Sequence, residues 1–147
     1  YKFFNKPSYC ETLAFLLSEK IKEMTNIGDF DIIMSVPLHK NKQNSRGYNQ
    51  SLLISKYISK IFNIPDVSAS LQRVKDTRSQ SLLDKEQRRD NVRDAFEVKD
   101  MAKVKGRNVL LIDDVLTTGS TLDECSRVLK QSGAKMVVGA VIATGRT

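Results

Sequence analysis

The segment Val109-Leu-Leu-Ile-Asp-Asp-Val-Leu-Thr-Thr-Gly-Ser-Thr121 is the most informative part of the chain. Its apolar start, Asn108–Asp113, predicts a buried strand that ends in two adjacent carboxylates. A hydroxyl-rich turn follows and leads into Thr121–Gln131, where apolar residues recur at helical spacing. Gly133 stands where a helix commonly ends in a left-handed residue. The segment therefore predicts a strand, a turn and a helix in direct succession.

The residues on either side of this segment predict further strands and helices. Phe30–Pro37 and Met136–Ala143 are short apolar runs typical of buried strands, and Val67–Leu71 is a candidate for a shorter one. Two amphipathic helices are expected, and their apolar residues are Leu13, Leu16, Leu17, Ile21 and Met24 in the first and Leu53, Tyr57, Ile58, Ile61 and Phe62 in the second. Alternation of strands and helices predicts an α/β fold with a parallel sheet and helices on both faces.

Length and composition predict one domain over residues 1–147, with an N-terminal helical region at 1–28. The chain has 147 residues, 40% of them hydrophobic and 28% charged. Its longest apolar run is much shorter than the ~20 residues that cross a bilayer, and its start lacks the layout of a signal peptide. We therefore expect a cytoplasmic protein without membrane insertion.

Cysteine and histidine are scarce. The two cysteines, Cys10 and Cys125, lie far apart and fit neither a zinc site nor a disulfide framework, so we expect both to be small buried residues. His39 is the only histidine.

The formal net charge of +7 favours an anionic partner. A phosphorylated small molecule and a nucleic acid are both consistent with this surplus. A third interpretation is that the charge only aids solubility.

The turn at Thr117–Thr121 is an expected anion cradle. Small hydroxyl residues and a glycine allow the backbone to approach a ligand, and the positive end of the following helix points at the turn. The alternative is an ordinary helix start, since Thr121-x-x-Glu124 matches a capping box. That alternative explains the threonines but not the acids.

Asp113 and Asp114 next to a phosphate site indicate a sugar. A carboxylate accepts hydrogen bonds from neighbouring sugar hydroxyls, and a divalent cation carried by the ligand would offset the repulsion between carboxylate and phosphate. A phosphate, a diol and Mg²⁺ together describe 5-phosphoribosyl-1-pyrophosphate (PRPP).

Two other polar segments lie between the expected elements. Residues 38–49 form a basic loop that contains Gly47. Residues 73–96 are long, polar and rich in charge, with a helix possible at Leu82–Asn91. We expect the second segment to be a flexible basic loop, and a solvated helix of mixed charge is the alternative.

The 109–121 segment resembles the PRPP-binding signature of type I phosphoribosyltransferases, which have a Rossmann-like core. The rest of the chain resembles the ComF family of competence-associated phosphoribosyltransferase-like proteins. The motifs that carry this resemblance are Val36-Pro37-Leu38, Arg46-Gly47-Tyr48-Asn49-Gln50, Arg73-x-x-x-Thr77-x-x-Gln80, Arg88-Arg89, Asn91 and Ala95-Phe96. The Arg73–Gln80 pattern is also similar to the phosphoribosyltransferase half of glutamine amidophosphoribosyltransferase.

The resemblance implies a role for each motif. Asp113 and Asp114 would hold the ribose 2- and 3-hydroxyls, and Asp114 is the nearest candidate for a general base. The 5-phosphate would lie in the PRPP-binding loop of Val115, Leu116, Thr117, Thr118, Gly119, Ser120 and Thr121. The pyrophosphate would face the loop that holds Leu38, His39, Lys40, Lys42, Arg46 and Gly47. The flexible loop that closes over the site would contain Arg73, Thr77, Gln80 and Arg88.

The resemblance also implies an activity, which is Mg²⁺-dependent transfer of a phosphoribosyl group from PRPP to a nitrogen nucleophile. Mg²⁺ would arrive with PRPP, without a direct ligand from the protein. The family link to competence and DNA uptake supports an alternative, a sensor of PRPP or a nucleotide that binds single-stranded DNA or competence and recombination proteins without turnover. A degenerate fold kept for protein contacts is a third hypothesis.

Two features of the family's pattern are not visible in this sequence. The N-terminal four-cysteine zinc module of many relatives has no counterpart, and no hood segment for reading a nucleobase is recognisable. The sequence leaves a homo-oligomer open.

Overall fold

The computed structural model describes residues 8–38, 49–75, 85–116 and 119–144. Its helices and strands, in chain order, are α1 (Ser8–Met24), β1 (Ile32–Ser35), α3 (Gln50–Phe62), β2 (Leu71–Arg73), α4 (Lys85–Val92), β3 (Phe96–Val98), β4 (Asn108–Leu116), α5 (Ser120–Gln131) and β5 (Met136–Thr144). Short 3₁₀ turns lie at Ile27–Asp29, Ser68–Ser70 and Met101–Lys103. No helix within these ranges is long and apolar enough to cross a bilayer.

A parallel sheet in the order β1-β4-β5 forms the centre of the molecule. An isolated parallel bridge between Ile33 and Asp66 extends the pairing beyond β1. The chain crosses from β4 to β5 through α5, as a parallel pair requires. The carboxyl ends of β1, β4 and β5 therefore meet at one edge of the sheet.

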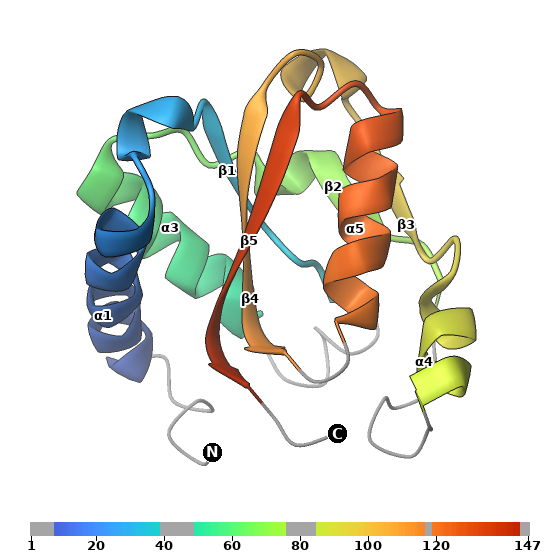
Figure 1. Cartoon of the computed structure of the whole chain (residues 1–147), viewed down its shortest axis with the longest axis horizontal. Helices are drawn as coiled ribbons and strands as arrows, with labels where there is room; N and C mark the ends of the chain where they lie inside the picture. Colours follow the sequence, from blue (N-terminus) through green and yellow to red (C-terminus); the bar gives the residue numbers. More distant parts are fainter. Residues whose placement is uncertain (1–7, 39–48, 76–84, 117–118, 145–147) are drawn as a thin grey trace.

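Helices cover both faces of this sheet (Figure 1). Alternate residues of β4 belong to opposite cores: Val109 and Leu111 pack in the cluster that includes α5, whereas Leu110 and Ile112 pack in the cluster that includes α1 and α3. All four are completely buried. This alternation explains the continuous apolar run, because a strand covered on both faces has no solvent side. The predicted fold class is confirmed.

The inward face of α1 differs from the one that the spacing of large apolar residues predicts. Leu17 and Ile21 are buried as expected, but Leu16 and Met24 are 58% and 73% exposed. Small residues take the inward positions instead, namely Cys10 and Ala14. The spacing of the large apolar residues misplaced the face because Cys10, although expected to be buried, and Ala14 were not used to define it.

The buried face of α3 is also rotated from the predicted one. Ile54 and Ile58 are buried, but Ile61 is 41% exposed. Two serines share the buried side, Ser51 and Ser55. Polar residues can occupy these positions because each hydroxyl finds a carboxylate partner.

The stretch 73–96, expected to be a flexible loop, has ordered elements at both ends. Arg73 ends β2 and Phe96 begins β3, and the two residues are directly paired in an antiparallel ribbon. Helix α4 occupies much of the range predicted to be helical. The strand expected at Val67–Leu71 was placed too early in the sequence, because Ser68–Ser70 is a 3₁₀ turn and β2 begins only at Leu71.

Candidate functional site

The site predicted from sequence lies at the carboxyl edge of the parallel sheet. Figure 1 shows the end of β4, the start of α5 and the start of α3 near the same lower edge of the molecule. Ligands of open α/β sheets bind at this edge. The fold therefore brings the residues of segment 109–121 to a place where binding is expected.

The two acids differ in burial although they are neighbours. Asp113 is 9% exposed, and its Oδ1 accepts hydrogen bonds from the Ser51 hydroxyl at 3.1 Å and the Asp114 backbone N–H at 2.9 Å. Asp114 is half-buried, and its Oδ1 accepts a bond from the Val115 backbone N–H at 2.8 Å. Both carboxyl groups are thus held in place by groups at the strand end.

Burial, then the negative charge of Asp114 and a side-chain hydrogen bond with Asp114, together raise the pKa of Asp113 to about 8. The hydrogen bonds from the Asp114 backbone and from Ser51 act against this and lower the pKa. Near neutral pH the acidic pair therefore holds a proton and carries less than two full charges. That reduces the repulsion that two carboxylates would exert on an anionic ligand.

Strand β4 continues beyond the two acids, which corrects the predicted strand end at Asp113. Val115 and Leu116, predicted to belong to the PRPP-binding loop, pair in register with Ala143 and Thr144 of β5. The long β5 supplies these partners. The turn is therefore shorter than predicted, and its Thr117 and Thr118 lie outside the described residues.

Gly119 is the N-cap of α5 and has a left-handed backbone with φ of 83°. Its carbonyl accepts the first helical hydrogen bond, from the N–H of Asp123 at 2.8 Å. Ser120 and Thr121, predicted to bind phosphate, form the first residues of the helix. The N-terminal end of α5, with its positive dipole, thus lies directly after the strand that carries the acids.

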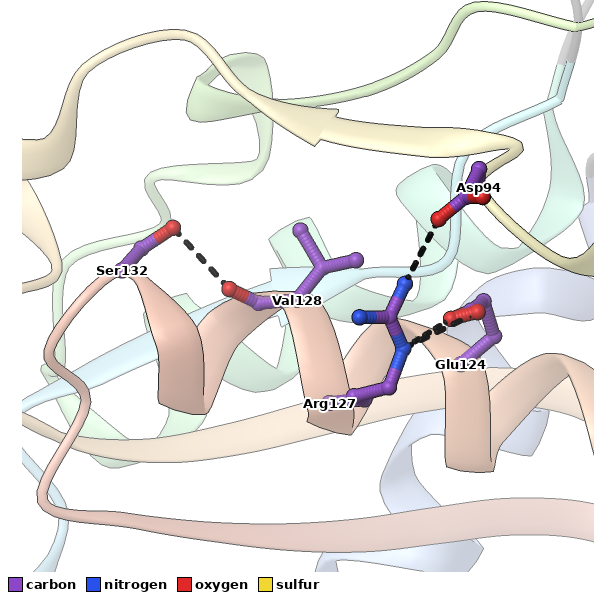
Figure 2. Close-up of polar contacts among 5 residues, drawn as sticks. All are labelled: Asp94, Glu124, Arg127, Val128 and Ser132. Carbon is purple, nitrogen blue, oxygen red and sulfur yellow. Dashed lines mark hydrogen bonds and ion pairs between the residues drawn. The ribbon is translucent and has the colours of Figure 1, made fainter.

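The capping box at Thr121 and Glu124, the alternative explanation of this turn, is wrong. Thr121 lies inside the helix rather than at its N-cap. Glu124 is buried and instead accepts a hydrogen bond from the guanidinium of Arg127 on the same helix. Figure 2 shows that Arg127 also reaches Asp94, at 3.1 Å, and so joins α5 to the turn between α4 and β3.

Sequence reasoning missed the start of α3 as part of the site. Asn49 caps this helix, its Oδ1 accepting from the N–H groups of Ser51 and Leu52, and its Nδ2 donates to the carbonyl of Val36 at 3.2 Å. Gln50 is 2% exposed, and neither polar atom of its side chain has a hydrogen-bond partner in the structure as described. The motif Arg46–Gln50 could have indicated that the start of α3 belongs to the site. It was used only to recognise the family resemblance and not to predict a contact with the acids.

Arg73 was expected in a mobile loop, and the structure places it in β2 instead. It is 8% exposed, and its guanidinium lies 5.2 Å from the centre of the Phe96 ring. Leu38, of the predicted pyrophosphate loop, and Arg73 both line a cavity of about 340 Å³. Arg73 is therefore a buried cation in the wall of this cavity, whose lining includes Leu38 and Asn49 but none of the described residues of segment 109–121.

Most residues of the two predicted loops are not described by the structure. These are His39, Lys40, Lys42, Arg46, Gly47, Thr77 and Gln80. Arg88 lies in α4, but its side chain is outside the described atoms. Their predicted roles stay predictions.

Both cysteines are buried, as expected. Burial raises the pKa of the Cys125 thiol well above its usual value, and the charges of Asp113 and Glu124 act in the same direction. Among the described residues, no three His, Cys, Asp or Glu side chains come together as a metal site would require.

Comparisons with known proteins agree with this geometry. Residues 49–147 match the family model described as the phosphoribosyl transferase domain. The chain is 36% identical to competence protein F of Haemophilus influenzae over 93% of its own length and 62% of that relative. It is 32% identical to DNA utilization protein YhgH of Escherichia coli K12 over 92% of its length and 60% of the relative. The chain thus spans about 60% of these curated relatives.

Solved structures share the fold at low sequence identity. Glutamine PRPP amidotransferase from B. subtilis, complexed with ADP and GMP, superimposes with a TM-score of 0.62 and 20% identity. The match covers 92% of this chain and 26% of that one.

Proposed function

The chain belongs to the phosphoribosyl transferase domain family and is a homologue of competence protein F, and from this premise we propose that it binds PRPP at the carboxyl edge of β4. The observation that carries the proposal is the sequence of features at that edge. An acidic pair with one buried and one half-buried member, a glycine with left-handed backbone and the start of a helix follow one another between Asp113 and Ser120. Few ligands need a diol-binding acid and an anion-binding helix end this close together, and a ribose 5-phosphate needs both.

In this proposal Asp113 and Asp114 accept hydrogen bonds from the ribose 2- and 3-hydroxyls. The backbone from Thr117 to Thr121 holds the 5-phosphate. Mg²⁺ enters as part of the substrate, bound to the phosphates of PRPP, and lowers the charge that the acids face. The proton held by the acidic pair near neutral pH reduces the same repulsion.

We further propose that the chain transfers the phosphoribosyl group to a nitrogen nucleophile. The bond between C1 of the ribose and the pyrophosphate oxygen breaks, and its electron pair leaves with pyrophosphate. The lone pair of the nitrogen forms the new bond to C1, and the nitrogen then loses a proton, for which Asp114 is the nearest acceptor. Binding of the leaving group and exclusion of water would supply most of the rate enhancement.

PRPP binding is tested by thermal shift. A ligand at about 100 times its dissociation constant adds ~2.7 kcal/mol of stability, so PRPP with Mg²⁺ should raise the Tm of the parent clearly. The double variant Asp113→Asn/Asp114→Asn should lose most of this increase. Asp31→Asn is the matched control, because Asp31 accepts a backbone hydrogen bond from Asn108 at the opposite edge of the sheet.

An equal increase in the parent and the double variant would remove the role of the acids. Turnover is measured separately, as pyrophosphate released from PRPP when candidate amines or nucleobases are added. PRPP binding without such release would favour a sensor over a transferase.

A second candidate function is binding of single-stranded DNA. The net charge of +7 favours a polyanion, and two relatives are named for competence and for DNA utilization. If DNA is bound through its phosphates, the affinity for an oligonucleotide falls steeply as salt rises. Affinity that is absent at low salt would exclude this function.

A further inference from the structure

The hydroxyl of Ser51 contacts the more buried acid of the site. Ser51 is the second residue of α3, is 3% exposed and donates a hydrogen bond of 3.1 Å to Oδ1 of Asp113. The two residues are far apart in sequence and belong to different elements. At 3.1 Å the bond is longer than the commonest O–H···O distance, so its main effect is on the orientation of the carboxyl group.

Ser51 is itself held in place by the cap of α3. Asn49 accepts the backbone N–H of Ser51 at 3.0 Å and donates its side-chain amide to the carbonyl of Val36, just beyond β1. The hydrogen bonds thus run from the end of β1, through Asn49 and Ser51, to the acid on β4. They connect the two ends of the predicted pyrophosphate loop to the ribose-binding acid.

We propose that Ser51 is a positioning residue of the site, which orients the carboxyl group of Asp113 for the ribose hydroxyls. The inference rests on the proposed function. The Ser51 hydroxyl and the Asp114 backbone N–H both donate to Oδ1 of Asp113, and the side chain of Asp114 also interacts with this carboxyl group. The bond from Ser51 adds a second donor on Oδ1, from another element, and so restricts the rotation of the carboxyl group.

The surroundings of Asp113 make this single bond important. Asp114 on β4 raises the pKa of Asp113, and the bonds from the Asp114 backbone and Ser51 lower it. Arg73 of β2 and Glu124 of α5 act, like Asp113, on the pKa of the Cys125 thiol, but neither is among the groups that shift the pKa of Asp113. Loss of the Ser51 hydroxyl would leave Asp113 both freer to rotate and harder to ionise.

Four variants test the inference: Ser51→Ala, Ser51→Cys, Asp113→Asn and the double variant Ser51→Ala/Asp113→Asn. Two readouts are needed, the affinity for PRPP with Mg²⁺ by calorimetry from pH 6 to 9 and the carboxyl ¹³C titration of Asp113 in the ligand-free protein. Ser51→Ala should weaken affinity about five- to tenfold and raise the pKa of Asp113. Ser51→Cys, a residue of similar size and weaker donor strength, should fall between Ser51→Ala and the parent.

Ser55→Ala is the matched control. Ser55 lies one turn further along α3, is also buried, and donates a hydrogen bond of 2.7 Å to Asp66 rather than to Asp113. Its loss should lower stability as much as Ser51→Ala does but leave PRPP affinity and the Asp113 titration unchanged. A purely structural role of Ser51 would make the two variants behave alike.

The double variant completes the test. In the Asp113→Asn background, Ser51→Ala should weaken affinity much less than in the parent, because the ionisable group that Ser51 orients for the ribose has already been replaced by an amide. Equal losses in the two backgrounds, or an unchanged Asp113 titration in Ser51→Ala, would overturn the role of Ser51 and leave the proposed function intact. A parent that does not bind PRPP would overturn the proposed function and, with it, this role.

Discussion

At the scale of single residues, the acidic pair is a site where folding and binding make opposite demands. Burial of an ionised carboxylate costs free energy, and Asp113 is buried beside a second acid. Neither burial nor the neighbouring charge helps the fold. An acid kept under these conditions is typical of a functional position.

We predict that Asp113→Asn stabilises the ligand-free protein as pH rises. An acid whose pKa rises on folding holds its proton more tightly in the folded state. Its favourable contribution to the free energy of unfolding is therefore complete below the unfolded pKa of 3.8. That contribution is lost as pH rises to about 8. Asparagine keeps an oxygen acceptor for Ser51 and carries no charge. The variant should match the parent near pH 4 and exceed it increasingly as pH rises toward 8, by up to ~1.4 kcal/mol for each unit of pKa shift.

The measurement is the free energy of unfolding in urea at several pH values between 4 and 9. Asp31→Asn serves for comparison, because Asp31 lies at the opposite edge of the sheet, where it accepts the backbone N–H of Asn108. A gain for Asp113→Asn that does not depend on pH would contradict the assigned pKa.

At the scale of elements, the passage from β4 to α5 depends on one backbone conformation. Gly119 adopts φ of 83°, a region that side chains with a Cβ occupy at a cost. Among the described residues, a Cβ placed there would meet Leu116 and Asp123, at the ordinary contact distances of 3.7 and 3.9 Å. The restriction is therefore one of backbone conformation and not of space.

We predict that Gly119→Ala lowers stability by about 1 kcal/mol and weakens PRPP binding about tenfold or more. The expected physical reason is that relief of the strained φ would turn the start of α5 away from the phosphate. Calorimetry with PRPP and Mg²⁺ measures the affinity, and urea unfolding measures the stability.

Gly106→Ala provides the control for this prediction. Gly106 has a similar φ of 75°, and a Cβ there would meet nothing within 4 Å. It lies just before β4, at the other end of the strand. The two variants should lose similar stability, and unchanged PRPP affinity in Gly119→Ala would show that the turn does not hold the phosphate.

At the scale of the whole molecule, β4 couples two separate hydrophobic cores. Leu110 belongs to the core under α1 and α3, and Leu111 belongs to the core under α5. Each residue is completely buried, although they are adjacent in the chain. Both helical layers therefore pack against the same central strand.

We predict that Leu110→Ala and Leu111→Ala each cost about 2–5 kcal/mol of stability. Because β4 belongs to both cores, either cavity should lower the unfolding midpoint of the whole domain in one transition. Phe15→Ala is the control, since Phe15 is 55% exposed and should change stability by less than about 0.5 kcal/mol. Two separate transitions in either leucine variant would show that the layers fold independently.

The sequence by itself determined the fold class and the order of features in segment 109–121. Apolar runs without alternation predict strands covered on both faces, and a glycine after hydroxyl residues predicts a turn into a helix, because both signals are local in the chain. They placed the acids of Asp113 and Asp114, the start of α5 and the left-handed Gly133 close to where the structure has them.

Only the tertiary structure decided which residues surround those acids. Ser51 reaches Asp113, Arg73 packs on Phe96 and Arg127 joins Glu124 to Asp94 across elements that are distant in the chain. The buried serines and small residues of α1 and α3 were likewise misplaced by the spacing of large apolar residues. A buried polar side chain is tolerated only where a partner meets it, and that partner is supplied by the packing of other elements rather than by neighbouring sequence.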